Sequence, residues 1–376
     1  MDFTTTIIDW YLQNKRDLPW RRTRDPYLIW VSEIILQQTR VEQGLPYFIK
    51  ITRAYPDIRS LAGAEEQELL KLWQGLGYYT RARNMLAASR VIMDRYQGVF
   101  PGDYASIRAL KGIGDYTAAA IASIAFNVPH PVVDGNVLRL FSRFFGIDIP
   151  IDRSSVKKEI HDLAQSLIDP ENPGDFNQAV MEFGARVCIP SNPDCNACCL
   201  SESCRAYKTG MVHLLPKRSE KQIVPDRTIH YLVISYQQGQ ESGLFMKQRE
   251  ERDIWHHLFD FPQYQEERER HPGSPIPLKS LKRWFSPHHP DFQGVTGPVK
   301  HKLTHQNLSV WFYRFHVNGK PRLPYQAVPF HELKFLPVPR LIDRYIRDLF
   351  IFAPGFLNFK MDDGPALSKK INPPLH

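Results

Sequence analysis

The sequence predicts a multidomain protein with an all-α part followed by a mixed α/β part. Three observations support this fold class. The chain of 376 residues is too long for one ordinary hydrophobic core. All five cysteines precede residue 210, whereas 12 of the 14 histidines and 18 of the 30 prolines follow it. Apolar residues recur at spacings of three and four before that boundary, and short β-type runs separated by turn residues come after it.

The expected elements follow these patterns along the chain. Helices are expected within 26–41, 65–77, 81–96 and 135–147, and strands at 228–236 and 308–317. Residues 209–227 are charged, bounded by proline and weakly periodic, which is typical of a linker. We therefore expect a helical domain over 1–208, a second domain over 228–350 and a poorly ordered tail over 351–376.

The net charge of +8 favours a polyanionic partner. Residues 1–210 nevertheless contain 24 basic and 24 acidic side chains, and the remainder contains 24 and 16. Any DNA-binding face on the helical part therefore depends on local geometry. The sequence has no charged-then-apolar leader and no apolar stretch of membrane-spanning length, so we expect an intracellular, cytoplasmic protein.

Four cysteines form a spaced cluster, with Cys199 as an additional bystander. Six, two and five residues separate Cys188, Cys195, Cys198 and Cys204. Disulfides are the alternative, but nothing indicates an oxidising compartment. Four thiolates in a proline-containing loop can surround one metal centre, and the spacing alone leaves zinc and an iron-sulfur cluster both open.

The stretch LKGIGDYT predicts a tight turn that leads into a helix. Gly112 and Gly114 are expected to provide positive φ angles and close backbone approach, and Asp115 is a good candidate for the helix N-cap. Free N–H groups at such a turn favour a phosphate, although a plain turn is the alternative. The next residue is Tyr116. Its side chain has two interpretations, a phenol that takes part in a functional site or an aromatic ring that packs in the core.

Two carboxylates occur next to apolar helical segments. Asp134 lies in an Asp-Gly turn directly before a helix, where we expect it to be the N-cap residue, 20 positions after Gly114 and with Asn136 beside it. Glu33 lies among apolar neighbours, where a solvated stripe with Gln37 and Arg40 is the alternative interpretation. One protonated and one ionised carboxyl group can divide acid and anion roles when their environments separate their pKa values.

These motifs together resemble the helix-hairpin-helix DNA glycosylases related to endonuclease III. The cysteine spacing is similar to the loop that holds a [4Fe-4S] cluster in that family, and LKGIG is similar to its hairpin, with Lys111 in place of the usual proline. Within the family, SEIILQQT together with Tyr116 resembles the adenine DNA glycosylases of the MutY type. The expected fold is thus an all-α helix-hairpin-helix glycosylase domain with a [4Fe-4S] loop over 188–204.

The resemblance implies roles for the candidate catalytic residues. Glu33 would be the general acid that protonates adenine N7, and Asp134, positioned by Asn136, would be the anion beside the sugar cation. Members that cleave the strand carry a lysine where this chain has Tyr116, because an amine must attack the sugar C1′ to form an imine. The phenol therefore predicts a monofunctional glycosylase.

The same resemblance implies a set of DNA-contacting residues. Arg21 and Glu182 would line the adenine pocket, and Gln38 and Thr39 would probe the gap left by the flipped base. Tyr78 would wedge beside the oxidised base, with core packing as its alternative. Leu36 would contact the substrate together with these residues. The DNA backbone would be held by Lys111, Gly112 and Gly114.

The second domain resembles the α/β Nudix-like domain found at the end of MutY proteins. RDIWHHLFDFPQY carries this similarity, but no REUxEExG helix for magnesium is present, so nucleotide pyrophosphatase activity is not expected. By resemblance Thr304 and His305 would recognise 8-oxoguanine, in a loop where Leu303 replaces the usual phenylalanine.

The expected function is a monomeric DNA repair glycosylase that removes adenine opposite 8-oxoguanine, and opposite guanine, in double-stranded DNA, with a [4Fe-4S] cluster as cofactor. Two alternatives remain at this point. One is an endonuclease III-like bifunctional lyase acting on oxidised pyrimidines, and the other is a non-catalytic iron-sulfur DNA-binding protein.

Overall fold

The computed structural model describes residues 2–220, 224–250, 253–264, 274–284, 290–320 and 323–352. The helical part contains α1 (Phe3–Asn14), α2 (Pro26–Leu36), α3 (Val41–Ala54), α4 (Ile58–Ala62), α5 (Glu66–Trp73), α6 (Thr80–Tyr96), α7 (Tyr104–Arg108), α8 (Asp115–Phe126), α9 (Gly135–Phe145), α10 (Ser154–Leu167), α11 (Pro173–Arg186) and α12 (Arg205–Lys208). Short 3₁₀ helices span Pro19–Arg21 (η1) and Ser201–Ser203 (η2).

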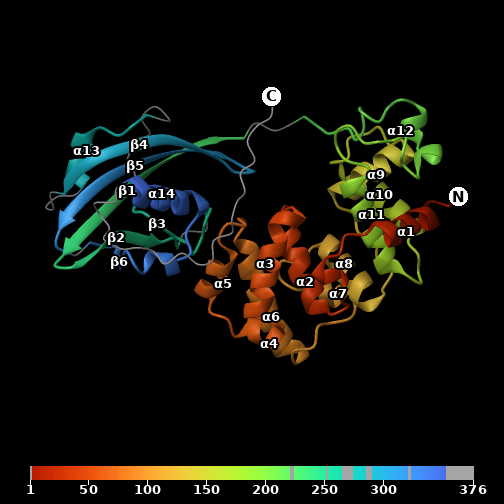
Figure 1. The fold of residues 1–376 in the computed structure, drawn as a ribbon, viewed down its shortest axis with the longest axis horizontal. Helices are drawn as coiled ribbons and strands as arrows, with labels where there is room; N and C mark the ends of the chain where they lie inside the picture. The colour runs from red at the N-terminus through yellow and green to blue at the C-terminus, as the bar shows by residue number, and fades with distance from the viewer. Residues whose placement is uncertain are drawn as a thin grey trace, which may run out of the picture.

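The helical part is built around two hydrophobic cores. The first is formed mainly by α2 to α8, and its largest buried side chains include Trp30 and Trp73. The second is formed by α1 with α9, α10 and α11, where Phe141, Phe176 and Phe183 are buried. Helix α8 contributes to both cores, because its alanine-rich sequence lets other helices approach from two sides. Figure 1 shows the two helical groups side by side, with α8 between them.

The expected helix over 26–41 is two helices separated by a loop. Helix α2 ends at Leu36, and α3 begins at Val41. Gln38 in the intervening loop adopts a positive φ of 56°, which an α-helix cannot accommodate. Glu33 on α2 is only 7% exposed, so the interpretation of Glu33 as part of a solvated stripe is wrong.

The second part is a twisted mixed sheet covered on both faces by helices. The strands are β1 (Asp226–Gln238), β2 (Glu241–Gln248), β3 (Phe259–Asp260), β4 (Asp291–Lys302), β5 (Asn307–Asn318) and β6 (Gln326–Pro329), in the order β3-β2-β1-β5-β4 with β6 paired to β2. Only the β1–β5 ladder of this described sheet is parallel. Helix α14 (Arg340–Phe352) packs on one face, and α13 (Leu278–Trp284) packs on the other.

The second domain contacts the first through a loop and through α14 with the short helix η3 (Leu333–Phe335) before it. Leu258 is fully buried in the first helical core, and Trp255 packs against that core. Lys71 Nζ donates to the Leu336 carbonyl oxygen, and Gln74 Nε2 donates to Asp343 Oδ1, both over 2.9 Å. These contacts place the β4–β5 hairpin beside the helical domain (Figure 1).

The expected domain classes, all-α followed by α/β, are confirmed. Of the tail expected over 351–376, residues 351 and 352 end α14 and the others lie outside the described residues. Among the helices that the structure describes, none combines the length and apolar character needed to cross a membrane.

Candidate active site

Glu33 is a buried carboxyl group in the middle of α2. Asp25 begins this helix by accepting a hydrogen bond from the Tyr27 N–H, and the apolar residues around Glu33 pack into the first core. The pKa of Glu33 is raised to about 7, chiefly by burial and in part by the nearby Asp134 charge, while interactions with Tyr116 and Arg21 oppose the shift. Such a group exchanges its proton near neutral pH.

Tyr116 lies on the first turn of α8 and faces both carboxylates. Its hydroxyl is 3.1 Å from Met181 Sδ, and its interaction with Glu33 lowers the pKa of that carboxyl group. Burial, together with the charges of Glu33 and Asp134, keeps the pKa of Tyr116 well above 10. The side chain therefore remains a neutral phenol at neutral pH.

Asp134 is the N-cap residue of α9, as expected. Its Oδ1 accepts hydrogen bonds from the Asn136 and Val137 N–H groups, both over 2.8 Å, and its Oδ2 accepts one from Asn136 Nδ2 over 2.7 Å. Burial raises the pKa of Asp134, although these bonds oppose the rise. Burial and the three hydrogen bonds therefore shift this pKa in opposite directions, and the hydrogen bonds favour the charged carboxylate.

Arg139 orients Asn136 from one turn further along α9. Its Nη2 donates to Asn136 Oδ1 over 3.0 Å, which directs the Asn136 amide N–H₂ toward Asp134. The same guanidinium donates to the Gly184 carbonyl oxygen and, through Nε, to the Cys188 carbonyl oxygen over 2.7 Å. Sequence reasoning missed Arg139, although its position five residues after an N-cap aspartate was visible.

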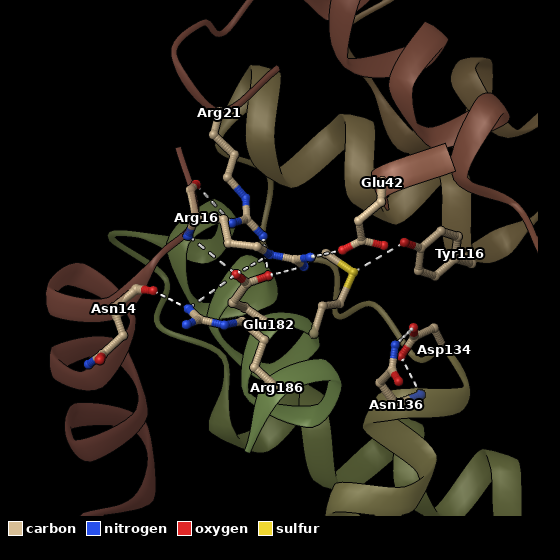
Figure 2. A network of polar contacts seen from close by, with 10 residues as sticks. Asn14, Arg16, Arg21, Glu42, Tyr116, Asp134, Asn136, Glu182 and Arg186 are labelled. Carbon is tan, nitrogen blue, oxygen red and sulfur yellow. Dashed lines mark hydrogen bonds and ion pairs between the residues drawn. The ribbon is translucent and has the colours of Figure 1, made fainter. Parts of the chain in front are cut away.

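Glu182 on α11 is the centre of a cluster of arginines (Figure 2). Arg16 contacts both of its carboxylate oxygens over 2.7 Å, Arg21 Nη2 lies 2.7 Å from Oε2, and Arg186 Nη1 lies 3.7 Å from Oε1. The arginines lower the pKa of Glu182 to about 2 in spite of its burial. The structure thus brings Arg21 and Glu182 together, and it adds Arg16, which sequence reasoning missed.

Figure 2 also shows how the arginine cluster lies relative to the α8 and α9 termini. Tyr116 and Asp134 lie on the same side of the cluster in this view, and Asn136 points back toward Asp134. Arg21 is within electrostatic range of Glu33, because its charge lowers the Glu33 pKa. One region therefore contains a carboxyl group with a pKa of about 7, a capped aspartate and a buried glutamate surrounded by arginines.

Arg81 connects two loops that contain predicted DNA-contacting residues. Its Nη1 donates to the carbonyl oxygens of Ile34 and Ile35 over 2.9 and 3.0 Å and to that of Gln37, at the end of α2. Its Nη2 donates to the Gly77 carbonyl oxygen over 3.2 Å. Arg81, another residue missed from the sequence, therefore fixes the loop after α2 against the loop before α6.

The two loops present their side chains differently. Gln38 in the loop after α2 is exposed, whereas Thr39 in the same loop and Leu36, the last residue of α2, are half-buried. In the other loop, Tyr78 is 47% exposed with a φ of 48°, so it is not a core residue. Neighbouring Tyr79 is buried and donates to the Val338 carbonyl oxygen over 3.3 Å.

The β4–β5 turn brings the second domain to Tyr78. The Thr304 hydroxyl forms a hydrogen bond with the Tyr78 hydroxyl, and His305 beside it is exposed. The Leu303 N–H donates to the Gln306 carbonyl oxygen over 2.9 Å and closes the turn. Leu303 itself is half-buried against the core of the second domain.

The hairpin between α7 and α8 is exposed at Lys111, Gly112 and Gly114. Gly112 has the expected positive φ of 83°, and an added Cβ would lie 2.6 Å from Asn84 Cβ. Gly114 has a φ of −91° with open space around it, so the expectation of positive φ there is wrong. Asp115 is not the N-cap either: Gly114 is the N-cap of α8, and the Asp115 carboxylate pairs with Arg108 on α7.

Cys188, Cys195, Cys198 and Cys204 line one cavity beside α9, and Cys199 does not. Arg143 on α9 donates to the carbonyl oxygens of Ile189 and Pro190 over 2.7 and 2.9 Å and so supports the loop. In the part of the chain that the structure describes, no three His, Cys, Asp or Glu side chains converge on a single-ion site. Four cysteine sulfurs around one shared cavity form a donor set that suits a [4Fe-4S] cluster, and zinc accepts the same ligands.

Comparisons with known proteins agree with this geometry. Residues 31–166 match the family described as HhH-GPD superfamily base excision DNA repair protein, and residues 230–348 match the NUDIX domain family. The chain is 33% identical over 312 residues to the adenine DNA glycosylase of Buchnera aphidicola subsp. Baizongia pistaciae, covering 82% of this chain and 84% of that protein.

Two further similarities extend the comparison. The chain is 31% identical over 377 residues to the adenine DNA glycosylase of Homo sapiens, covering 87% of this chain and 69% of that protein. The solved structure of a thermostable thymine-DNA glycosylase superposes with a TM-score of 0.51 and 31% identity. That neighbour covers 55% of this chain, and 95% of its own chain is matched.

Proposed function

The chain belongs to the family of adenine DNA glycosylases, and on this premise we propose that it hydrolyses the N-glycosidic bond of adenine mispaired with 8-oxoguanine, and with guanine, without cleaving the DNA strand. The observation that carries the proposal is the buried Glu33 carboxyl group, whose pKa is raised to about 7 and which interacts with Tyr116 and Asp134.

In the proposed reaction, protonated Glu33 transfers its proton to adenine N7. The bonding electrons between C1′ and N9 then leave with the base, so that adenine departs neutral and the sugar becomes an oxocarbenium-like cation. Asp134, held ionised by the N–H groups of α9 and by Asn136, stabilises this cation. Water adds to C1′ and releases its proton to a carboxylate, which leaves an abasic sugar.

Recognition of adenine is assigned to the arginine cluster. Glu182, with a pKa lowered to about 2, is a permanent acceptor for the exocyclic amino group of adenine. Arg16 and Arg21 neutralise the buried carboxylate and hold its oxygens in fixed positions. Guanine presents a carbonyl oxygen at the corresponding edge and would be repelled.

Recognition of the oxidised partner base is assigned to the interdomain contact. Tyr78 would wedge beside 8-oxoguanine, and Thr304 and His305 would hydrogen-bond it from the β4–β5 turn. Gln38, Thr39 and Leu36 would occupy the gap left by the flipped adenine, and Lys111, Gly112 and Gly114 would contact the DNA backbone.

Cys188, Cys195, Cys198 and Cys204 would hold a [4Fe-4S] cluster. When bound, the cluster would cross-link the 188–204 loop and supply structural order rather than a reacting group. The chain's own contribution is Arg143, which holds the carbonyl groups of the loop, and Arg139, which joins the loop to Asn136.

Single-turnover excision from duplexes with adenine opposite 8-oxoguanine, guanine or thymine tests the substrate. We expect excision opposite 8-oxoguanine and guanine and little opposite thymine. Equal rates on all three duplexes would contradict the assigned mispair recognition.

Borohydride trapping tests the monofunctional mechanism. An imine between an amine and C1′ is reduced to a stable adduct, and Tyr116 cannot form one. We expect no efficient trapping. Efficient trapping on a duplex with an oxidised pyrimidine would instead favour the endonuclease III-like lyase.

A Glu33→Gln variant separates chemistry from binding. We expect it to bind the 8-oxoguanine:adenine duplex but to lose excision by about a hundred- to ten-thousandfold, because it has no proton to transfer. Glu68→Gln, an exposed glutamate on α5, is the matched control and should excise normally. Full excision by Glu33→Gln would remove Glu33 from the mechanism.

A further inference from the structure

A basic cleft of about 820 Å³ opens between the two domains, separate from the arginine cluster and the carboxylates. Residues of α3 and the end of α5 form one wall, and residues from η3 to α14 form the other. The described lining contains six basic side chains and a single acidic one, Asp343: the basic residues are Lys50, Lys71, Lys334, Arg340, Arg344 and Arg347.

Only part of this positive charge is neutralised within the protein. Asp343 pairs with Arg347 over 3.2 Å and accepts a hydrogen bond from Gln74. Lys71 Nζ is occupied by Gln74 Oε1 and by a carbonyl oxygen of the second domain. In the described ranges, no carboxylate lies within ion-pair distance of Lys50, Arg340 or Arg344, and all three are exposed.

The crowding of cations affects Lys71, the most buried of them. The pKa of Lys71 is lowered to about 8, chiefly by burial and in part by the charges of Lys50 and Arg347, while Asp343 opposes the shift. An anion in the cleft would relieve this repulsion. Arg340 and Arg344 are also four residues apart on α14, so they project from the same face of that helix.

The cleft adjoins the proposed site of the oxidised base. Gly75 lines the cleft and belongs to the loop that carries Tyr78, whose hydroxyl contacts Thr304. A DNA strand that places a base between Tyr78 and Thr304 would have its neighbouring phosphates close to this region. The two walls belong to different domains, so an anion bound there would hold the domains around the strand.

We propose that this interdomain cleft binds phosphodiester groups of the strand that carries the oxidised base, outside the mispair itself. The inference rests on the proposed function in one respect, since its ligand is the same duplex. The contacts would be to phosphate oxygens and therefore independent of sequence. They would add affinity that depends strongly on salt concentration.

The test is the salt dependence of DNA binding by the whole protein. The duplex carries 8-oxoguanine opposite a tetrahydrofuran abasic analogue, which cannot be hydrolysed, and extends beyond both domains. If Arg340 and Arg344 each neutralise one phosphate, Arg340→Gln/Arg344→Gln should reduce the slope of log K against log salt by about 2. Lys50→Gln, on the opposite wall, should reduce it by about 1.

The control removes the same charge elsewhere. Arg53→Gln/Arg95→Gln changes two exposed arginines of the helical domain that do not line the cleft, and it should leave the slope unchanged. Equal slopes for the cleft and control variants would overturn the proposal, because the effect would then be one of overall charge.

Tripolyphosphate distinguishes a free polyphosphate ligand. If it raises the melting temperature of the wild type but not of Arg340→Gln/Arg344→Gln, while the DNA slopes remain equal, the cleft binds free polyphosphate and the proposal is overturned. If instead the wild type fails to excise adenine but the predicted slope difference is found, the proposed function fails and the phosphate site stands.

Discussion

At the scale of single residues, two buried glutamates show how the surroundings divide chemical roles. Glu33 is 7% exposed and Glu182 is 1% exposed, but their pKa values move in opposite directions. Desolvation favours the neutral form of both groups and, acting alone, would raise both pKa values. Two arginines hydrogen-bond Glu182 and reverse the shift, whereas the interactions of Glu33 with Tyr116 and Arg21 only partly oppose its desolvation.

The raised pKa of Glu33 predicts a pH dependence of excision. The acid must be protonated, and its pKa is about 7 in the folded protein. The single-turnover rate constant should therefore fall by about tenfold per pH unit above pH 7. Rate constants measured from pH 5 to pH 9 on an 8-oxoguanine:adenine duplex check this. A flat profile across this range would contradict the assigned acid.

The same shift predicts a pH-dependent gain in stability for Glu33→Gln. The folded pKa of about 7 exceeds the ordinary value of 4.5, so the folded state binds the proton more tightly and the wild type loses stability as pH rises from 4.5 to 7. Glutamine cannot ionise and avoids this loss. The variant should exceed the wild type by about 3 kcal/mol at pH 8 and by little at pH 4.

Chemical unfolding at both pH values measures this difference. Glu68→Gln on the exposed face of α5 should show no gain at either pH. If Glu33→Gln behaved like Glu68→Gln at pH 8, the carboxyl group would not be desolvated in the folded protein.

At the scale of elements, α9 connects the cysteine loop to Asp134, the proposed anion of the reaction. Asp134 caps its N-terminus, Arg139 holds Asn136 and the Cys188 carbonyl oxygen, and Arg143 holds the loop beyond it. Arg139 and Arg143 are one turn apart, so one face of the helix carries both contacts. Helix α9 thus supports the cysteine loop and also orients Asp134.

This arrangement predicts that Arg139 acts on the rate through Asn136. Arg139→Leu leaves buried carbonyl groups without a donor and should cost about 1–3 kcal/mol for each. It also frees the Asn136 amide to rotate, so the single-turnover rate constant should fall by about ten- to a hundredfold. Arg139→Lys keeps the charge and should restore part of the rate.

A double variant tells positioning from general destabilisation. If Arg139 works through Asn136, Asn136→Ala/Arg139→Leu should have the same rate constant as Asn136→Ala alone, while its stability falls further. Independent, multiplying losses of rate would show that Arg139 acts by another route.

At the scale of the whole molecule, the two domains meet at the residues assigned to the oxidised base. Trp255 and Leu258 anchor the second domain in the first core, and the β4–β5 turn then places Thr304 against Tyr78. Neither domain contains both side chains. Discrimination between 8-oxoguanine and guanine is therefore expected to depend on the domain arrangement.

A double-mutant cycle tests this dependence. Thr304→Val and Tyr78→Phe each remove one hydroxyl, and each should reduce the preference for 8-oxoguanine over guanine by about fivefold, equivalent to about 1 kcal/mol. The double variant should lose no more than either single variant. Thr209→Val, at an exposed threonine, is the control. Additive losses would mean that the two hydroxyls act separately.

The amino-acid sequence by itself determined the domain classes, the helix N-cap at Asp134 and the presence of cysteines, carboxylates and a glycine hairpin. These are local properties, because hydrophobic period, capping and turn chemistry act over a few residues. Only the tertiary structure decided that Glu33 is buried, that Glu182 is surrounded by Arg16 and Arg21, and that the basic cleft exists. Those features join segments far apart in the chain, and desolvation and charge pairing depend on distances in space. At the hairpin, Gly114 and not Asp115 is the N-cap of α8, and the Asp115 carboxylate pairs with Arg108 seven residues earlier, at the end of α7.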